Sequence, residues 1–168
     1  SYLSPAPVYY ASPSVGMDEA GGFIVVWGTR GQDRPPNSWG VFGKRFDPSG
    51  NPLGSEFQVN TFTTGTQFSQ SVAMNREGAF VVSWSSFPPS GETGQDGSES
   101  GIFAQRYTSA GIPTGGEFQV NSFVTGSQES PAIAMDDDGD FVVAWTSYGQ
   151  DGDDYGIYAQ RFRSLDTG

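Results

Sequence analysis

The chain of 168 residues contains no cysteine and no histidine. Without cysteine it can form neither a disulfide framework nor a thiolate nucleophile. Without histidine it lacks the commonest general base of enzymes and the commonest side-chain ligand of transition metals. These absences exclude a His- or Cys-based catalytic triad in this chain, and they weigh against an enzymatic function.

Basic residues are scarce as well, since eight Lys and Arg stand against nineteen Asp and Glu, for a net charge of −11. Nucleic acids and anionic membrane surfaces are both bound through basic patches, so neither is an expected partner. The longest apolar run, FIVVW at 23–27, is only as long as a β-strand, and we expect no membrane insertion. The first residues, SYLSPAPVYY, resemble no signal peptide.

Glycine and proline, by contrast, are abundant, with 24 and 11 residues. No segment carries a convincing helical period of apolar residues, so the composition favours an all-β protein rich in turns. Such a composition suits an extracellular protein. We therefore expect an extracellular or cell-surface location.

One unit of sequence occurs three times. The segments PSVGMDEAGGFIVVW (13–27), QSVAMNREGAFVVSW (70–84) and PAIAMDDDGDFVVAW (131–145) align without a gap. Their last residues, Trp27, Trp84 and Trp145, are spaced 57 and then 61 residues apart. A second pair, GSEFQVN (54–60) and GGEFQVN (115–121), keeps the 61-residue spacing. The chain is therefore predicted to build the same small structural unit three times.

Each unit is predicted to contain four short strands. In the third unit PAIAM and DFVVAW flank a tight turn, GIFAQRY of the second unit alternates like a strand, and EFQVN supplies the last strand. A repeated four-stranded meander is typical of a β-propeller blade. We predict an all-β propeller in one repeat domain (1–168) of three four-stranded antiparallel blades, at about 12–60, 69–121 and 130–163.

Three blades are fewer than the roughly four to eight that close a propeller ring. We therefore expect either a homo-oligomer, with two chains forming a six-bladed ring, or a place in a longer repeat array. The third unit has no EFQVN strand, whereas residues 6–10, APVYY, form an extra extended segment. Residues 6–10 are the predicted closing strand of the incomplete blade, and a frayed terminus is the alternative.

Two sets of apolar residues are expected in the core. The repeated tryptophans should fill the space between neighbouring sheets. The three methionines occupy one repeat position, and they should fill irregular gaps in the same cores. They are Met17, Met74 and Met135.

The combination of GIYAQRF, EFQVN and PAIAMDDDGDFVVAW resembles tandem repeats of large secreted or surface-attached bacterial proteins. The resemblance covers nearly all of the chain. It implies propeller-type blades in adhesin-like or calcium-associated exoproteins, and it implies no single activity. A weaker similarity is to the integrin-type FG-GAP blade, whose hairpin loop binds calcium through alternating carboxylates.

Only MDDDGDF at 135–141 approaches that calcium pattern, with Asp136, Asp138 and Asp140 at alternate positions. The equivalent turns of the other units, DEAG and NREG, depart from it. Calcium takes six to eight oxygen ligands. It is thus a candidate cofactor at the third hairpin alone, where a solvated turn is the alternative, and no other cofactor is expected.

The motif Gly-Gln-Asp follows each strand that ends in Trp, so its three copies should lie on one rim. An amide and a carboxylate beside an exposed ring suit a sugar, whose hydroxyls take the polar groups while its apolar face takes the ring. The candidate ligand-binding residues are Gln32, Asp33, Trp39, Gln95, Asp96, Gln150, Asp151 and Tyr155.

A structural role of the motif is the alternative. Each Asp can cap its own loop, or it can form a bidentate pair with the Arg that recurs at 45, 106 and 161. Repetition alone copies such structural residues as faithfully as functional ones.

These observations favour an extracellular, non-enzymatic binding or adhesion module, with carbohydrate as the favoured ligand among extracellular partners. One alternative is a structural repeat protein that self-assembles at a surface. The other is a fragment of a polysaccharide-active enzyme, in which Asp153 with Asp154, or Glu92 with Glu99, would supply paired carboxylates.

Overall fold

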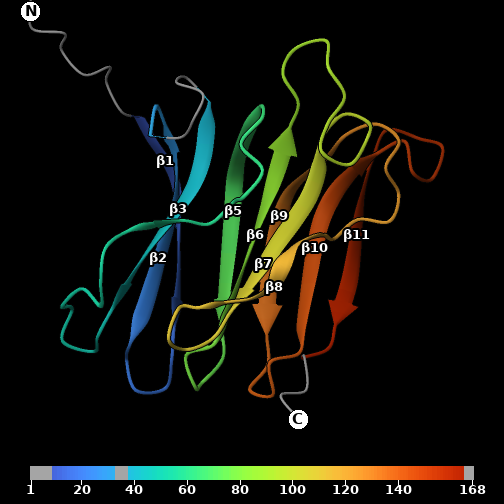
Figure 1. Ribbon diagram of the computed structural model, residues 1–168. Helices are drawn as coiled ribbons and strands as arrows, with labels where there is room; N and C mark the ends of the chain where they lie inside the picture. Colours follow the sequence, from blue (N-terminus) through green and yellow to red (C-terminus); the bar gives the residue numbers. More distant parts are fainter. Residues whose placement is uncertain (1–8, 33–37, 165–168) are drawn as a thin grey trace, which may run out of the picture.

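The computed structural model describes residues 9–32 and 38–164. These residues form eleven β-strands in three antiparallel sheets that stand side by side (Figure 1). Within these ranges no helix is long and apolar enough to cross a membrane. The all-β prediction is confirmed.

Each sheet is a meander of consecutive strands, and we call the three sheets blades 1, 2 and 3. Blade 1 contains β1 (Tyr9–Met17), β2 (Phe23–Arg30), β3 (Trp39–Phe46) and β4 (Phe57–Gln58). Blade 2 contains β5 (Thr66–Met74), β6 (Phe80–Phe87), β7 (Gly101–Tyr107) and β8 (Pro113–Gln119). Blade 3 contains β9 (Gln128–Met135), β10 (Phe141–Tyr148) and β11 (Tyr155–Phe162), so it has three strands in the described part of the chain.

The hairpin between the first two strands is built alike in every blade. In blade 3 the N–H of Asp136 bonds the carbonyl of Asp140 at 2.9 Å, and the Asp136 carboxylate accepts the N–H of Asp140 at 2.9 Å. Gly139 between them has a φ of +85°, a conformation that glycine adopts without a steric penalty. The repeated D/N-x-x-G segments are therefore tight turns, as the sequence predicts.

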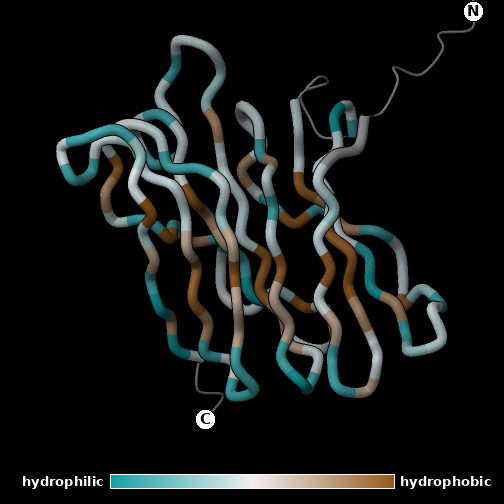
Figure 2. The backbone as a smooth tube through the Cα atoms, turned by 180° about the vertical axis from the view of Figure 1, so that it is seen from behind, coloured by the Kyte–Doolittle hydropathy of each residue, from teal (hydrophilic) through white to brown (hydrophobic). Residues whose placement is uncertain are grey.

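The alternation of side chains gives each blade two unlike faces. One face, which we call the aromatic face, carries Phe80, Val82 and Trp84 in blade 2, together with Phe103 and Tyr107 of the neighbouring strand. The opposite, aliphatic face of blade 2 carries Val81, Ile102 and Ala104. In Figure 2 the hydrophobic segments run along the strands, while the hairpin turns are hydrophilic.

The two contacts between blades join an aliphatic face to an aromatic face. Ile24, Val26 and Val41 of blade 1 form one core with the aromatic face of blade 2. The aliphatic face of blade 2 forms a second core with the aromatic face of blade 3, which comprises Phe141, Val143 and Trp145. Because truncating a buried aromatic costs about 3–5 kcal/mol, these two cores hold the blades together.

The core prediction is confirmed for Trp84 and Trp145, which are buried. Met74 and Met135 pack against the two cores as partly buried residues. The prediction is wrong for Met17, which is 62% exposed. Met17 lies on the aromatic face of blade 1, and no blade in the described part of the chain covers that face.

The first strands β1, β5 and β9 lie next to one another along the inner edges of the blades. The N–H of Val72 donates to the Ser14 hydroxyl at 3.3 Å, and the N–H of Ile133 donates to the Ser71 hydroxyl at 3.4 Å. Each first strand also contains a bulge with a serine at positive φ, between 50° and 57°. These serines are Ser12, Ser69 and Ser130.

The structure corrects the prediction of a closing strand at residues 6–10 for its last two residues. Tyr10 pairs with Thr29, and Tyr9 pairs with Arg30, as the first residues of β1. Strand β1 has the same nine residues as its equivalent β5, in which Thr66 pairs with Phe87, so Tyr9 and Tyr10 belong to blade 1. Residues 6–8 lie outside the described residues.

Blade 1 and blade 2 are each tied to the next blade by a buried amide clamp. The Asn121 side chain accepts the N–H of Ile102 at 2.8 Å and donates to the carbonyl of Phe123 and to Gln128, both at 2.9 Å. Asn60 makes the equivalent bonds to Val41, Phe62 and Gln67. Because Gln67 and Gln128 begin the next inner strand, each clamp fixes the crossing from one blade to the next.

We predict that Asn121→Ala lowers the free energy of unfolding by about 2 kcal/mol, because it leaves a buried N–H, a carbonyl and an amide without partners. For a chain of this length the midpoint of thermal unfolding should fall by about 4–8 °C, as measured by circular dichroism. Asn51→Ala is the matched control, since Asn51 is exposed and its side chain bonds only Asp47 in this turn. Equal shifts for both variants would contradict the clamp.

Candidate functional site

The Gly-Gln-Asp motifs lie at the ends of the second strands, where each chain segment leads to the third strand of its blade. We call this end of the molecule, at the top of Figure 1, the upper rim. Gln32, Gln95 and Gln150 follow β2, β6 and β10 respectively, so the predicted common rim is observed. Asp33 lies outside the described residues.

Two of the motif glutamines are bonded within their own blade. The Gln32 amide donates to the carboxylate of Glu56, and the Gln95 amide donates to that of Glu117. The second oxygen of Glu117 accepts the N–H and the hydroxyl of Thr61, at 2.7 Å and 2.9 Å. In these two blades the glutamine therefore links the motif loop to the segment beside the outer strand.

The motif aspartates fold back over the first residues of the third strand. Asp96 accepts the N–H of Ser98 at 3.0 Å, and a Cβ at Gly101 would lie 2.7 Å from its carboxylate. In blade 3 Asp151 accepts the N–H of Asp153 at 3.3 Å and lies close to Gly156. At Gly101 the aspartate occupies the space that a side chain would need, whereas at Gly156 the Tyr158 ring lies closer, 2.9 Å from the position of a Cβ.

Asp151 also contacts the Tyr158 hydroxyl. Burial raises the pKa of Tyr158, and the negative charge and hydrogen bond of Asp151 raise it further. The hydroxyl therefore stays protonated and bonded to the carboxylate. The capping role that was one alternative for these aspartates is confirmed for Asp96 and Asp151, whereas their contact with a ligand stays a prediction.

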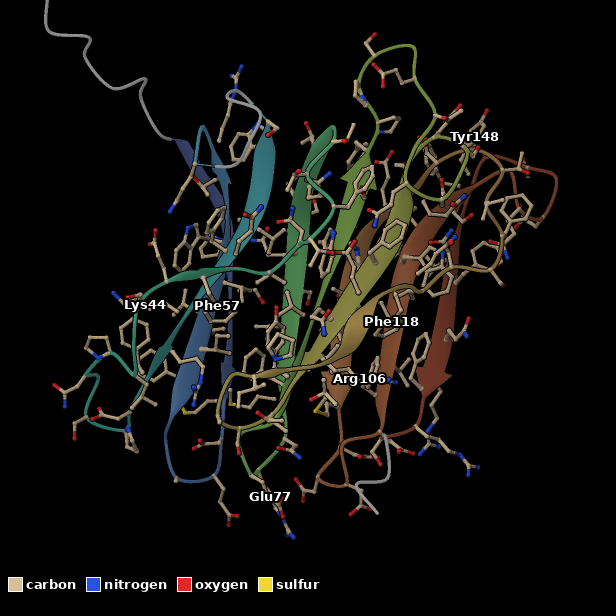
Figure 3. All side chains as sticks on the ribbon, viewed as in Figure 1. Lys44, Phe57, Glu77, Arg106, Phe118 and Tyr148 are labelled. Carbon is tan, nitrogen blue, oxygen red and sulfur yellow. The ribbon has the colours of Figure 1, made fainter. Side chains whose placement is uncertain are left out.

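The upper rim of blade 3 presents two exposed aromatic rings. Tyr148 ends β10 and is 49% exposed, and Tyr155 begins β11 and is 60% exposed. Their ring centroids lie 5.1 Å apart with a 62° interplanar angle, an edge-on arrangement. Tyr148 is labelled at the upper rim in Figure 3. The sequence pattern points to Tyr155 but misses its partner, which the pairing of the two strands supplies.

The positions equivalent to Tyr148 and Tyr155 carry other side chains in blades 1 and 2. Trp39, which is half-buried, pairs with Arg30 in blade 1. In blade 2 Phe87 ends β6 and stacks on Phe68, with centroids 4.8 Å apart. Among the described residues, blade 3 therefore offers the most exposed aromatic surface at this position.

The aspartates of the predicted calcium site lie at the opposite, lower rim. One carboxylate oxygen of Asp140 accepts a hydrogen bond from the Arg161 guanidinium at 2.8 Å. The other accepts a hydrogen bond from the N–H of Ser164 at 2.8 Å. Asp136 lies 3.9 Å from the same guanidinium, and Asp138 is exposed. No group of three or more acidic side chains in the described ranges could hold a metal ion. The calcium site stays a prediction that this geometry does not favour.

The recurring arginines pair with neither Asp96 nor Asp151, so that alternative is wrong for the two motif aspartates that the structure describes. Arg45 donates to the carbonyls of Ser109 and Ala110 in blade 2. Arg106 donates to the carbonyl of Arg163 in blade 3 at 3.2 Å. The arginines lie near the lower ends of their strands, far along the blade from the motif loops, and two of the three bridge to the next blade.

Arg106 is also packed between aromatic rings. Its guanidinium lies 5.0 Å from the ring centroid of Phe118 and 5.0 Å from that of Phe141 (Figure 3). Burial lowers the pKa of Arg106, although an arginine remains charged at any ordinary pH. The residue therefore contributes a cation–π contact as well as a hydrogen bond between blades 2 and 3.

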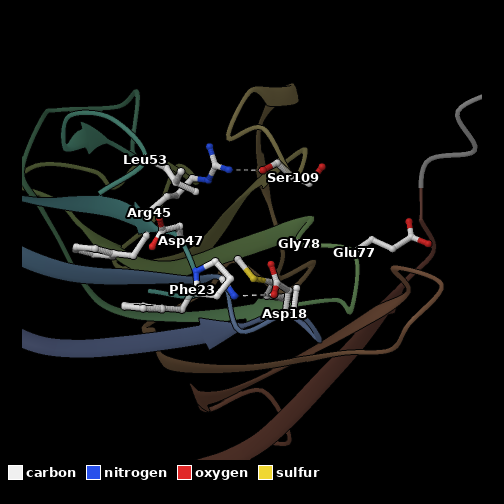
Figure 4. A pocket seen from close by; sticks show the side chains of 13 residues that line it. Asp18, Phe23, Arg45, Asp47, Leu53, Glu77, Gly78 and Ser109 are labelled. Carbon is white, nitrogen blue, oxygen red and sulfur yellow. Dashed lines mark hydrogen bonds between the residues drawn. The ribbon is translucent and has the colours of Figure 1, made fainter. Parts of the chain in front are cut away.

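A pocket of about 160 Å³ lies at the lower rim between blades 1 and 2 (Figure 4). Its polar wall includes Arg45, which bonds Ser109, and Asp18, which accepts the N–H of Gly22 at 2.8 Å. These charged groups are thus engaged by the protein itself. The pocket follows from the contact of two blades, and we do not assign it a ligand.

Comparison with known proteins supports the propeller-like fold but assigns the chain to no family. No protein-family profile matches the chain, and no curated protein matches it. The chain is similar to an endo-arabinase from Bacteroides thetaiotaomicron VPI-5482, with a TM-score of 0.57 and 11% identity over 97% of this chain and 60% of that one. It is also similar to the Hadza microbial sialidase Hz136, with a TM-score of 0.63 and 14% identity over 95% of this chain and 36% of that one.

These similarities, together with the three meander sheets, establish the class. The chain is an all-β protein built of β-propeller blades. It spans about 60% of the endo-arabinase and 36% of the sialidase, so it corresponds to part of a larger propeller in each. At these identities the likeness is one of fold, and the resemblance to bacterial surface repeats stays a prediction.

The lower rim gives a prediction about pH. The hydrogen bond from the Ser164 N–H, and then the bond and charge of Arg161, hold the pKa of Asp140 below the ordinary value of 3.8. A lowered pKa in the folded state stabilises the fold above the ordinary value, and this contribution is lost as the pH falls through the folded pKa. An NMR titration should place the Asp140 midpoint below 3.8.

Arg161→Ala should raise that midpoint without restoring it fully, because the Ser164 bond remains. A midpoint at or above the ordinary value in the unchanged protein would contradict the contacts described at this rim. A midpoint that Arg161→Ala leaves unchanged would contradict the role of the guanidinium.

Proposed function

We propose that the chain is part of an extracellular, non-enzymatic propeller that binds carbohydrate at the upper rim of blade 3. The observation that carries this proposal is the exposed pair of Tyr148 and Tyr155 beside a loop of three exposed carboxylates, Asp151, Asp153 and Asp154. Flat rings take the apolar face of a sugar, and carboxylates accept hydrogen bonds from its hydroxyls.

The site is held by a rigid frame. Tyr148 and Tyr155 are paired residues of β10 and β11. The loop between them is closed by a bond from the Gly149 N–H to the Asp154 carbonyl at 2.9 Å, and the Tyr148 N–H bonds the Ser127 carbonyl at 2.9 Å. Because little order has to be gained on binding, such a frame favours affinity.

In this proposal the motif residues shape the loop and the tyrosines supply the surface. Asp151 holds the loop through its bonds to Asp153 and Tyr158, and Gln150 lies at the base of the same turn. The equivalent loops of blades 1 and 2 carry different side chains behind the motif. We therefore propose one principal site, rather than three equal ones.

The charge of the loop indicates the class of sugar. Asp151, Asp153 and Asp154 are close in sequence and exposed, and the whole chain has a net charge of −11. An anionic sugar would be repelled by this surface, whereas a neutral one would not. The ligand we propose is a neutral, hydroxyl-rich glycan.

The comparisons support a carbohydrate rather than another ligand. The two structures compared above are named as enzymes that act on carbohydrates, an endo-arabinase and a sialidase. This support rests only on the similarity of fold. Because both proteins are named as enzymes, a polysaccharide-active enzyme remains the alternative function of this chain.

We predict that Tyr155→Ala and Tyr148→Ala each weaken binding of a neutral glycan about three- to tenfold, because each removes an aromatic contact. A glycan array identifies the ligand, and isothermal titration measures the variants. Tyr155→Phe, which keeps the ring, and Leu53→Ala, an exposed residue of blade 1, should bind as the unchanged protein does.

Equal binding by the unchanged protein and both alanine variants would refute this site. Preference for an anionic glycan would refute the inferred class of sugar. Turnover of a polysaccharide that Asp153→Asn abolishes would replace the binding function with an enzymatic one.

A further inference from the structure

The two end blades leave unlike faces uncovered. Blade 1 has an open aromatic face, with Phe23, Val25 and Trp27 on β2 and Met17 paired to Phe23. Blade 3 has an open aliphatic face, with Val142 and Thr146 on β10 and Ile157 on β11. No other blade of the described chain covers either face, as Figure 1 shows.

We propose that the aliphatic face of blade 3 packs on the aromatic face of blade 1 in a second copy of this chain. The template is present twice in the chain itself, because both internal contacts join these same two faces in this same order. The proposed contact continues that series by one step. It does not depend on the carbohydrate site.

The open aliphatic face has the apolar side chains that such a contact requires. Ile157 is 76% exposed and Val142 is 40% exposed. The residues at the same positions of blade 2, Ile102 and Val81, are 0% and 2% exposed, because blade 3 covers them. Exposed apolar residues gathered on one face mark an interaction surface.

The open aromatic face shows the same contrast. Val15 and Met17 are each 62% exposed. Their equivalents in blade 2 are Val72, which is 7% exposed, and Met74, which packs against the core. The face of blade 1 therefore repeats the residue types that blade 2 buries against blade 1.

Arg161 indicates the partner in a second, polar way. The equivalent arginines, Arg45 and Arg106, donate to backbone carbonyls of the blade that follows their own. No blade follows Arg161 within residues 9–32 and 38–164; its side chain is 67% exposed, and it bonds Asp140 of its own blade. In the proposed contact it would donate to the turn at 47–50 of the second copy, which is equivalent to the turn that Arg45 bonds.

Two copies form a closed assembly with this contact alone. A two-fold rotation makes both contacts between the copies identical, and it buries every open face. The assembly has six blades, which lies within the range that closes a propeller ring. An unlimited series of copies would instead leave open faces at both of its ends.

Light scattering on the purified chain tests the proposal. We expect a particle of twice the 17.9 kDa mass of one chain. Ile157→Glu should raise the dissociation constant of the dimer about a hundredfold or more, since it places a charge in both contacts. Because Ile157 is 76% exposed in one copy, the variant should keep the circular dichroism spectrum of a folded chain.

Ile112→Glu is the matched control, because Ile112 is 62% exposed on a turn of the middle blade. It should leave the dimer unchanged. Arg161→Ala should raise the dissociation constant of the dimer about tenfold. Pro48→Gly alters the turn at 47–50, and it should raise the dissociation constant less in the Arg161→Ala background than in the unchanged protein.

Three results would overturn the proposal. They are a folded chain that remains monomeric at millimolar concentration, a dimer that Ile157→Glu does not weaken, and polymers whose mass grows with concentration.

Discussion

The structure depends on the unlike faces of each sheet. A strand alternates its side chains between two faces, and here the alternation separates Phe, Val and Trp from smaller aliphatic residues. A sheet exposed on both apolar faces is unstable in water, so each blade needs neighbours of the opposite kind. The apolar faces require the sheets to pack on one another. The turns, the amide clamps and the arginine contacts then fix how each sheet is placed on its neighbour.

Polar groups give that packing its direction. The clamp of Asn121 and the contact of Arg106 both run from blade 2 to blade 3, and Asn60 and Arg45 run in the same sense from blade 1 to blade 2. Each of these groups would lose its partners if the sheets packed in another order. Apolar contact supplies the attraction between the sheets, and these hydrogen bonds exclude other orders of packing.

Much of the fold was predictable, because the repeat fixes it. The alignment of three units predicts the hairpins, the meander and the buried positions of Trp84 and Trp145. It fails at Met17, which occupies the repeat position of Met74 but lies on a face that no described blade covers. The site was less predictable: Asp96 and Asp151 recur for the loop they cap, and the partner of Tyr155 follows from strand pairing, which spacing alone does not show.

The amide clamps lie in the connections between blades, NTFTTGTQ and NSFVTGSQ, and so each travels with its unit. A unit that carries its own faces and its own link to the next can be duplicated or deleted without redesign of its neighbours. The number of blades is therefore open to change by simple recombination of the gene. A single loop, such as that between Tyr148 and Tyr155, can meanwhile diverge in one copy while the frame stays constant.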